Sequence, residues 1–216
     1  MRTAKLRRGI EGLLVGVLVS ASGAAAAEFS ANAGWVSEYI FRGVPQKTSS
    51  ASAGVDFEEG GFYIGTWGAD VGDGLEIDGY LGYTFEVEDF NFGIGGTGYY
   101  YTGDFDDTYQ EINLSFGFAK LSVDVAIGQY ENFAGPTQDY TFTSATLEHN
   151  GFHGTVGNFS QDFDGTYVDV GYGFSVAEEV DVSVSWIYSD KDLAFNAGEE
   201  DNTLVFGLSK SFSLSD

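Results

Sequence analysis

The sequence predicts an all-β chain that closes into an antiparallel transmembrane β-barrel of about twelve strands, preceded by a cleaved signal peptide. Three observations carry this prediction. The N-terminus has the layout of a secretory signal, apolar and polar residues alternate with a period of two along most of the remaining chain, and short connections alternate with longer ones.

The N-terminal segment indicates export. Four basic residues, Arg2, Lys5, Arg7 and Arg8, precede an uncharged apolar stretch at 12–19. Ala25 and Ala27 then occupy the −3 and −1 positions of an Ala-x-Ala cleavage site. The apolar stretch is too short for the ~20 residues that a membrane-spanning helix needs. We therefore expect residues 1–27 to be a signal peptide and 28–216 to form one outer-membrane barrel domain.

The charge of the chain limits the kinds of partner that it can bind. Four of the 9 basic and one of the 33 acidic residues lie in the predicted signal, which leaves 5 basic and 32 acidic residues, a formal charge of −27. This balance excludes nucleic acid as a partner, because binding phosphates requires lysine and arginine. It favours cations. The chain has no cysteine, so no disulfide framework holds it together, and no motif indicates a cofactor.

The alternation is clearest at 75–87. Leu75, Ile77 and Leu81 fall on one face of an extended chain, whereas Glu76, Asp78 and Tyr80 fall on the other. A helix would mix these two sets. Counting such runs predicts strands at 29–42, 49–58, 62–70, 75–87, 90–102, 109–119, 121–130, 139–149, 152–159, 166–176, 180–189 and 202–212. Counts of ten and fourteen remain open, and the facing of 139–149 and 152–159 is not predicted because they alternate poorly.

The connections separate into two groups. Those at 59–61, 88–89, 120, 150–151 and 177–179 are short, whereas those at 43–48, 71–74, 103–108, 131–138, 160–165 and 190–201 are longer. Outer-membrane barrels have tight periplasmic turns and longer external loops. Asn150-Gly151 is the strongest single hairpin signal, because this pair tolerates the positive φ angles of a type I′ turn. The alternative, a secreted β-sandwich, would have irregular connection lengths.

Aromatic residues separate by strand end. Tyrosines gather near the expected outer ends, at Tyr99, Tyr100, Tyr101, Tyr109, Tyr130, Tyr140, Tyr167 and Tyr188. Phenylalanines gather near the expected inner ends, at Phe57, Phe62, Phe85, Phe90, Phe118, Phe152, Phe174 and Phe212. We interpret both groups as interfacial belts at the lipid headgroups.

Three blocks resemble a known family. Residues 35–46 read Trp-Val-Ser-Glu-Tyr-Ile-Phe-Arg-Gly-Val-Pro-Gln, 61–67 read Gly-Phe-Tyr-Ile-Gly-Thr-Trp, and 76–83 read Glu-Ile-Asp-Gly-Tyr-Leu-Gly-Tyr. These blocks are similar to those of the TorF-type porins, a proteobacterial family of conserved hypothetical outer-membrane proteins. The resemblance implies an outer-membrane location and a pore, and it supplies no substrate.

The polar face of the strands identifies the candidate site. If the apolar face meets lipid, the lumen is lined by Glu38, Arg42, Glu76, Asp78, Tyr80, Glu111, Asn113, Asp124, Asp169 and Asp181. Carboxylates in a confined channel concentrate cations and repel anions. We therefore expect passive diffusion of small solutes with a preference for cations. The alternative is a structural or adhesion-type barrel without an open pore, since small barrels often fill their interior with side chains.

Other function classes have little support. The two histidines, His149 and His153, flank a predicted turn, and no Gly-x-Ser-x-Gly elbow is present, so we expect no enzyme. The acidic loops match no EF-hand pattern, and we expect no dedicated metal site. Weak surface binding of divalent ions that bridge lipopolysaccharide remains an alternative. The expected partners are outer-membrane lipid, lipopolysaccharide, small solutes or cations, and the barrel-assembly machinery of a Gram-negative cell.

Overall fold

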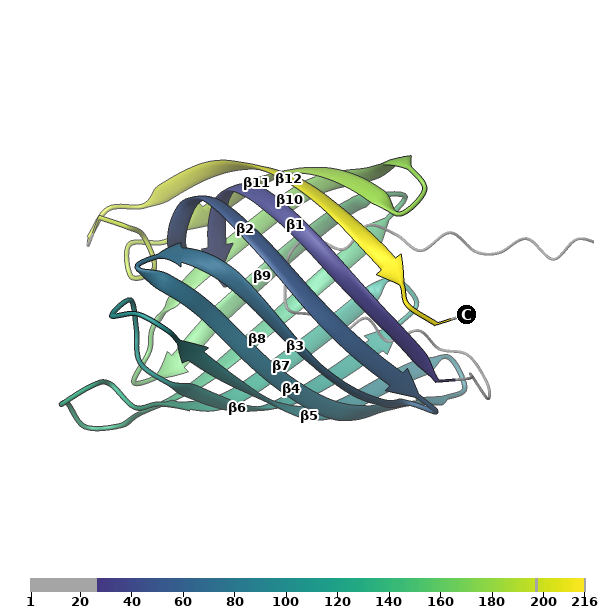
Figure 1. The fold of residues 1–216 in the computed structure, drawn as a ribbon. Coiled ribbons are helices and arrows are strands. Elements are labelled where there is room, and N and C mark those ends of the chain that lie inside the picture. Colours follow the sequence, from purple (N-terminus) through teal and green to yellow (C-terminus); the bar gives the residue numbers. More distant parts are fainter. Residues whose placement is uncertain (1–26, 197, 216) are drawn as a thin grey trace, which may run out of the picture.

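The computed structural model describes residues 27–196 and 198–215, which form a closed antiparallel barrel (Figure 1). Each strand pairs with its neighbours in sequence, and β1 pairs with β12 to close the wall. The strands are β1 Glu28–Phe41, β2 Val44–Glu59, β3 Phe62–Gly72, β4 Gly74–Val87, β5 Phe90–Tyr101, β6 Tyr109–Phe118, β7 Leu121–Tyr130, β8 Gln138–His149, β9 Phe152–Gln161, β10 Gly165–Ala177, β11 Val180–Ser189 and β12 Asp201–Ser213.

The predicted fold class and strand count are confirmed. All twelve expected strands are present, most with bounds within two residues of the prediction. The predicted signal peptide, except for Ala27, lies outside the described residues. Within the described ranges, no helix is long and apolar enough to cross a membrane.

Two of the six longer connections were predicted wrongly. Only Arg42 and Gly43 separate β1 from β2, and only Asp73 separates β3 from β4. Arg42 and Gly43 have φ angles of 51° and 82°, as a type I′ turn requires, so the strands continue to the turn. Pro45 lies within β2 and not in a loop, opposite Ile40 where the register shifts at a β-bulge. A bulge tolerates a residue that has no N–H to donate.

The two ends of the barrel differ. We call the end that holds the chain termini and the turns at 60–61, 88–89, 119–120, 150–151 and 178–179 the turn end, and the opposite end the loop end. Asn150 and Gly151 have φ angles of 52° and 83°, which confirms the predicted type I′ turn. The longest connections, 102–108, 131–137 and 190–200, lie at the loop end.

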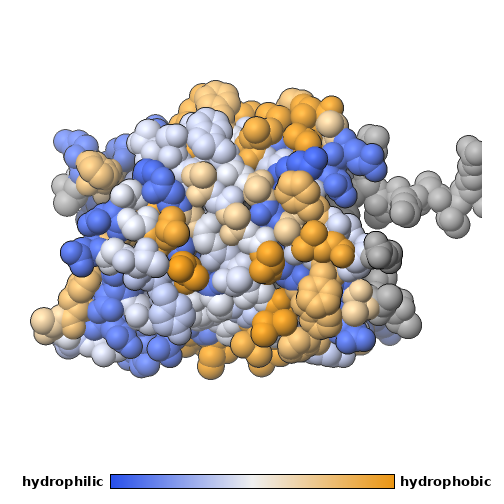
Figure 2. Space-filling view, viewed as in Figure 1, coloured by the Kyte–Doolittle hydropathy of each residue, from blue (hydrophilic) through white to orange (hydrophobic). Residues whose placement is uncertain are grey.

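The wall separates apolar from polar residues with the period of a strand. On β6, Ile112 is 57% exposed on the outside, whereas the adjacent Glu111 is 5% exposed on the inside. Ile77, Leu81 and Ile94 are likewise exposed on the outer wall. Figure 2 shows apolar side chains over the middle of the wall and toward the turn end, among many of intermediate hydropathy, and hydrophilic ones at both ends, most densely at the loop end. This is the surface that hydrocarbon requires of a spanning barrel.

The two predicted aromatic belts differ: four of the eight loop-end tyrosines are buried, although Tyr100 is 52% exposed. At the turn end Phe62, Phe118 and Phe152 are exposed, as expected of an interfacial belt. At the loop end Tyr99 and Tyr140 are buried; so are Tyr130 and Tyr167. The prediction of an outer tyrosine belt is therefore wrong for these residues. Their rings pack inside the loop-end half of the barrel and not against lipid.

Candidate functional site

A hairpin of the wall bends into the lumen. The loop-end parts of β1 and β2 curve inward beyond the bulge between Tyr39 and Ile40 (Figure 1). A bulge bends and twists the strand that carries it. The tip of this hairpin, residues 39–44, contacts strands on the far side of the barrel and therefore crosses the lumen. We call residues 39–44 the luminal hairpin.

Arg42, at the tip, forms a buried ion pair with the opposite wall. Both of its terminal nitrogens donate to the Glu111 carboxylate of β6, Nη2 to Oε2 at 3.0 Å. The side chains of Arg42 and Glu111 are 10% and 0% exposed. The guanidinium carbon lies 4.8 Å from the ring centre of Phe41 and 4.4 Å from that of Phe142. A two-pronged pair with cation–π contacts uses the flat geometry that is specific to arginine.

Further hydrogen bonds hold the luminal hairpin on two sides. The Tyr39 hydroxyl donates to Glu76 of β4 at 2.5 Å, and Tyr101 of β5 donates to the other oxygen of the same carboxylate at 3.0 Å. On the other side, the Ser189 hydroxyl of β11 donates to the Gly43 carbonyl at 2.6 Å. The hairpin is thus anchored to distant parts of the wall.

Asp78 of β4 is the exception among the inward-facing carboxylates. It is 0% exposed, and neither of its side-chain oxygens has a hydrogen-bond partner within the described part of the chain. Its neighbours across the sheet are Trp67 and Tyr99, whose rings contact Tyr39 and Phe41 of the luminal hairpin. The hairpin therefore covers Asp78, and a buried carboxylate without a partner is costly.

Aromatic residues fill the rest of the loop-end lumen. One buried cluster joins Tyr140, Phe142 and Phe159 with Leu193, which comes from the connection 190–200. Tyr130 of β7 belongs to the same cluster, and its ring stacks on that of Tyr109 of β6 with centres 4.3 Å apart. The hydroxyls of Tyr109 and Tyr130 donate to Asp106 at 2.8 and 2.7 Å. This packing explains why the inner face of β8 did not read as polar.

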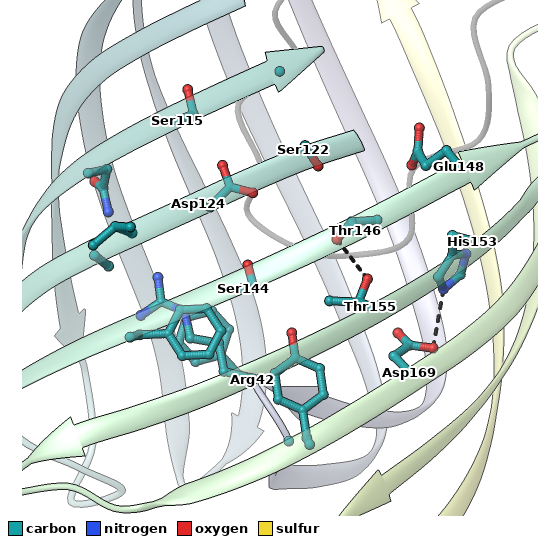
Figure 3. Close-up of a pocket in the computed structure, with 18 of the residues that line it drawn as sticks. Arg42, Ser115, Ser122, Asp124, Ser144, Thr146, Glu148, His153, Thr155 and Asp169 are labelled. Atoms are coloured by element: carbon teal, nitrogen blue, oxygen red, sulfur yellow. Dashed lines mark hydrogen bonds and ion pairs between the residues drawn. The ribbon is translucent and has the colours of Figure 1, made fainter. Parts of the chain in front are cut away.

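The lumen holds a cavity of about 560 Å³ that extends from the luminal hairpin to the turn end, in the range of small-ligand sites. Figure 3 shows its wall, where side chains of β6–β10 point inward. Small hydroxyl groups dominate that wall, and the labelled ones are Ser115, Ser122, Ser144, Thr146 and Thr155. Asp124, Glu148 and Asp169 add negative charge. Arg42 of the luminal hairpin also lines the cavity.

All ten residues expected in the lumen lie on the inner side of the barrel or at the luminal hairpin, but the structure divides them into groups. Arg42, Glu111 and Asn113 come together, because Asn113 donates to Glu111 at 3.0 Å. Glu76 and Asp78 are covered by the hairpin.

The remaining five lie apart from that group. Glu38, Asp124 and Asp169 line the cavity. Tyr80 donates to Asp56, and Asp181 accepts from Ser175 at 2.6 Å.

The histidines do not form a hydrolytic relay. His149 is exposed, and its Nδ1 lies 2.5 Å from the Lys120 ammonium. His153 lines the cavity, where its Nε2 lies 3.2 Å from Asp169 and 3.4 Å from the Ser185 hydroxyl. A Ser-His-Asp relay uses the two ring nitrogens separately, whereas here both partners approach the same one.

The sequence did not reveal the luminal hairpin. Tyr39, Phe41 and Phe142 complete the site around Arg42 and were not among the expected lumen residues. The available signal was the pair Arg42-Gly43 between two strands, because this pair suits a two-residue turn and shortens the expected loop.

A polar lumen inside an apolar outer wall, closed by twelve antiparallel strands, is the fold of outer-membrane porins. Two solved structures share it. The NanC porin matches with a TM-score of 0.53 at 10% identity, over 86% of this chain and 100% of that chain. A protein from work on in-meso crystallization of membrane proteins matches with a TM-score of 0.56 at 10% identity, over 88% and 85% of the two chains. At such identity the likeness shows the fold alone.

The chain belongs to the bacterial protein family Gcw_chp, described as being of unknown function, whose model matches residues 20–212. No curated protein matches the chain.

Proposed function

We propose that this protein is exported by its signal peptide, inserted by the barrel-assembly machinery, and works in the outer membrane as a TorF-type porin for small, preferentially cationic solutes. The observation that carries the proposal is the charge of the lumen. The cavity is lined by the acidic residues Glu38, Asp124, Glu148 and Asp169. Of the basic residues that line it, Arg42 is paired with Glu111, His153 lies against Asp169, and Lys120 stands at the turn end. A water-filled space with this balance concentrates cations.

The luminal hairpin sets the constriction in this proposal. It crosses the loop-end half of the lumen, and the cavity continues from it toward the turn end. Passage of a solute therefore requires residues 39–44 to move. A two-residue turn at the tip of a hairpin is a small element, and its movement leaves the strands of the wall paired.

The same hairpin favours a second candidate function, a closed structural barrel. In that case the ion pair and the aromatic packing only stabilise the fold, as inward side chains do in many small barrels. The structural barrel predicts no conductance under any condition in which the wall remains folded.

Planar-bilayer recording of the refolded protein tests the porin proposal. In a potassium chloride gradient we expect single-channel openings whose reversal potential has the sign of cation preference. Arg42→Ala, which removes one of the anchors of the hairpin, is expected to open more often than wild type. Lys47→Ala serves as the control, because Lys47 pairs with Asp70 at the other side of the hairpin base. Silence of both wild type and Arg42→Ala favours the structural barrel, and an anion preference contradicts the proposal.

A further inference from the structure

The place that Arg42 occupies has the features of a receptor for a planar cation. The Glu111 carboxylate takes both prongs of the guanidinium, and the Phe142 ring covers one face of it at 4.4 Å. A carboxylate that binds side-on next to an aromatic face matches a guanidinium better than an ammonium, because only the guanidinium is flat and carries paired donors.

The wall builds this receptor independently of its occupant. Besides Arg42, the Glu111 carboxylate accepts hydrogen bonds from Tyr99 at 3.0 Å, Tyr140 at 2.7 Å and Asn113 at 3.0 Å. These donors belong to β5, β8 and β6, which are paired strands of the wall. Because none of them lies on the luminal hairpin, they keep the carboxylate oriented toward the lumen when Arg42 leaves.

The receptor also borders the cavity, with the Glu111 side chain, which is 0% exposed, behind Arg42. Tyr99, Phe142 and Arg42 all line the same space that extends to the turn end. The cavity wall carries Asp124 and Glu148, so a cation that enters it is attracted along the path to the receptor. A small guanidinium compound is well within the size that about 560 Å³ accommodates.

Arg42 itself behaves as a tethered ligand. It stands at the tip of a two-residue turn, where its neighbour Gly43 accepts a hydrogen bond from Ser189 and lies against Tyr167. A tethered ligand raises its own local concentration, so a free competitor binds more weakly than it does to a vacant site.

We propose that the lumen contains a guanidinium-binding site, formed by Glu111, Tyr99, Tyr140, Asn113 and Phe142, which small guanidinium-bearing solutes occupy in competition with Arg42. The inference that guanidinium-bearing solutes cross the membrane rests on the proposed porin function. The inference that they bind in the lumen does not depend on it.

Calorimetry on refolded barrels in detergent tests the site without any measurement of conductance. Arg42→Ala vacates the receptor, and methylguanidinium, methylammonium and the uncharged isostere N-methylurea are the probes. We expect methylguanidinium to bind Arg42→Ala at least about tenfold more tightly than either other probe. Wild type is expected to bind it measurably but at least about tenfold more weakly, because Arg42 competes. The control Lys47→Ala keeps the receptor occupied and is expected to behave as wild type.

The second variant, Arg42→Ala with Glu111→Gln, removes the charge that faces the probe and is expected to abolish the preference for methylguanidinium. If Arg42→Ala does not refold alone, Arg42→Gln replaces it, and refolding of Arg42→Ala that depends on methylguanidinium and not on N-methylurea supports the site. Equal affinity of all three probes, equal affinity of wild type and Arg42→Ala, or no wild-type binding overturns the proposal. If the protein binds methylguanidinium selectively but shows no conductance, only the proposed porin function is contradicted.

Discussion

Replacement of Arg42 by alanine is the most direct test of the luminal hairpin. The substitution removes a guanidinium that donates two hydrogen bonds to Glu111 and lies against the rings of Phe41 and Phe142. It leaves every strand of the wall paired, because Arg42 lies in the turn between β1 and β2. The expected result is a barrel that still folds but is less stable.

The size of the expected loss in the free energy of unfolding follows from the hydrogen bonds that Glu111 keeps. Loss of one partner from a buried ion pair costs roughly 3–5 kcal/mol, because the other charge stays buried. Glu111 keeps three donors, Tyr99, Tyr140 and Asn113, so the loss belongs near the lower limit. We expect the free energy of unfolding to fall by about 3 kcal/mol, more than about a hundredfold in the folding equilibrium.

Reversible urea unfolding in lipid bilayers, followed by tryptophan fluorescence, measures this loss. The slope of the free energy of unfolding against urea concentration should remain unchanged if the substitution affects only stability. Arg42→Lys keeps the charge but not the planar fork and is expected to recover less than half of the loss. Lys47→Ala breaks a partly exposed ion pair and should cost below about 1 kcal/mol. A loss for Arg42→Ala no larger than that of Lys47→Ala would refute the reasoning.

Four further predictions concern the lumen and the wall. Gly43→Val should lower the free energy of unfolding by at least about 1 kcal/mol in the same urea assay, because φ is +82° and a Cβ would lie 2.5 Å from that of Tyr167; a neutral effect would contradict the inward position of the turn. Asp78→Asn should raise stability by about 1 kcal/mol, since the amide cannot ionise and the buried carboxyl group that it replaces has no hydrogen-bond partner among the described residues; a destabilised variant would contradict this. Asp124→Asn should move the reversal potential in a salt gradient toward zero, whereas an unchanged value would remove Asp124 from the determinants of cation preference. Leu114→Arg places a charge on the outer wall and should cost about 2–4 kcal/mol in lipid if the residue lies near the midplane; a cost near zero would be inconsistent with contact between hydrocarbon and this part of the wall.

The ion pair also explains how a strongly acidic lumen can be closed. Glu76 is satisfied by two tyrosine hydroxyls and Glu111 by arginine and three further donors. The hairpin therefore covers an acidic region in which the Asp78 carboxyl group has no hydrogen-bond partner among the described residues. A movement that uncovers Asp78 returns its carboxylate to water, which favours the displaced hairpin and opposes its closure.

The sequence by itself determined the barrel. Alternation at positions such as Glu111 and Ile112 specifies which face is polar, and Asn150-Gly151 specifies where the chain reverses, because both are local properties of an extended backbone. Antiparallel order and a count of about twelve strands followed from these local patterns, and the structure fixed the count at twelve.

Only the tertiary structure decided what the lumen contains. Arg42 meets Glu111 and Phe142, which lie far from it in sequence, and the bend that brings them together depends on a bulge opposite Pro45 that no periodicity shows. The inner face of β8 carries Tyr140 and Phe142 for the same reason, so its polar pattern is lost where the hairpin packs. Contacts across a lumen depend on where the chain ends up in space, and a pattern with a period of two carries no information about that distance.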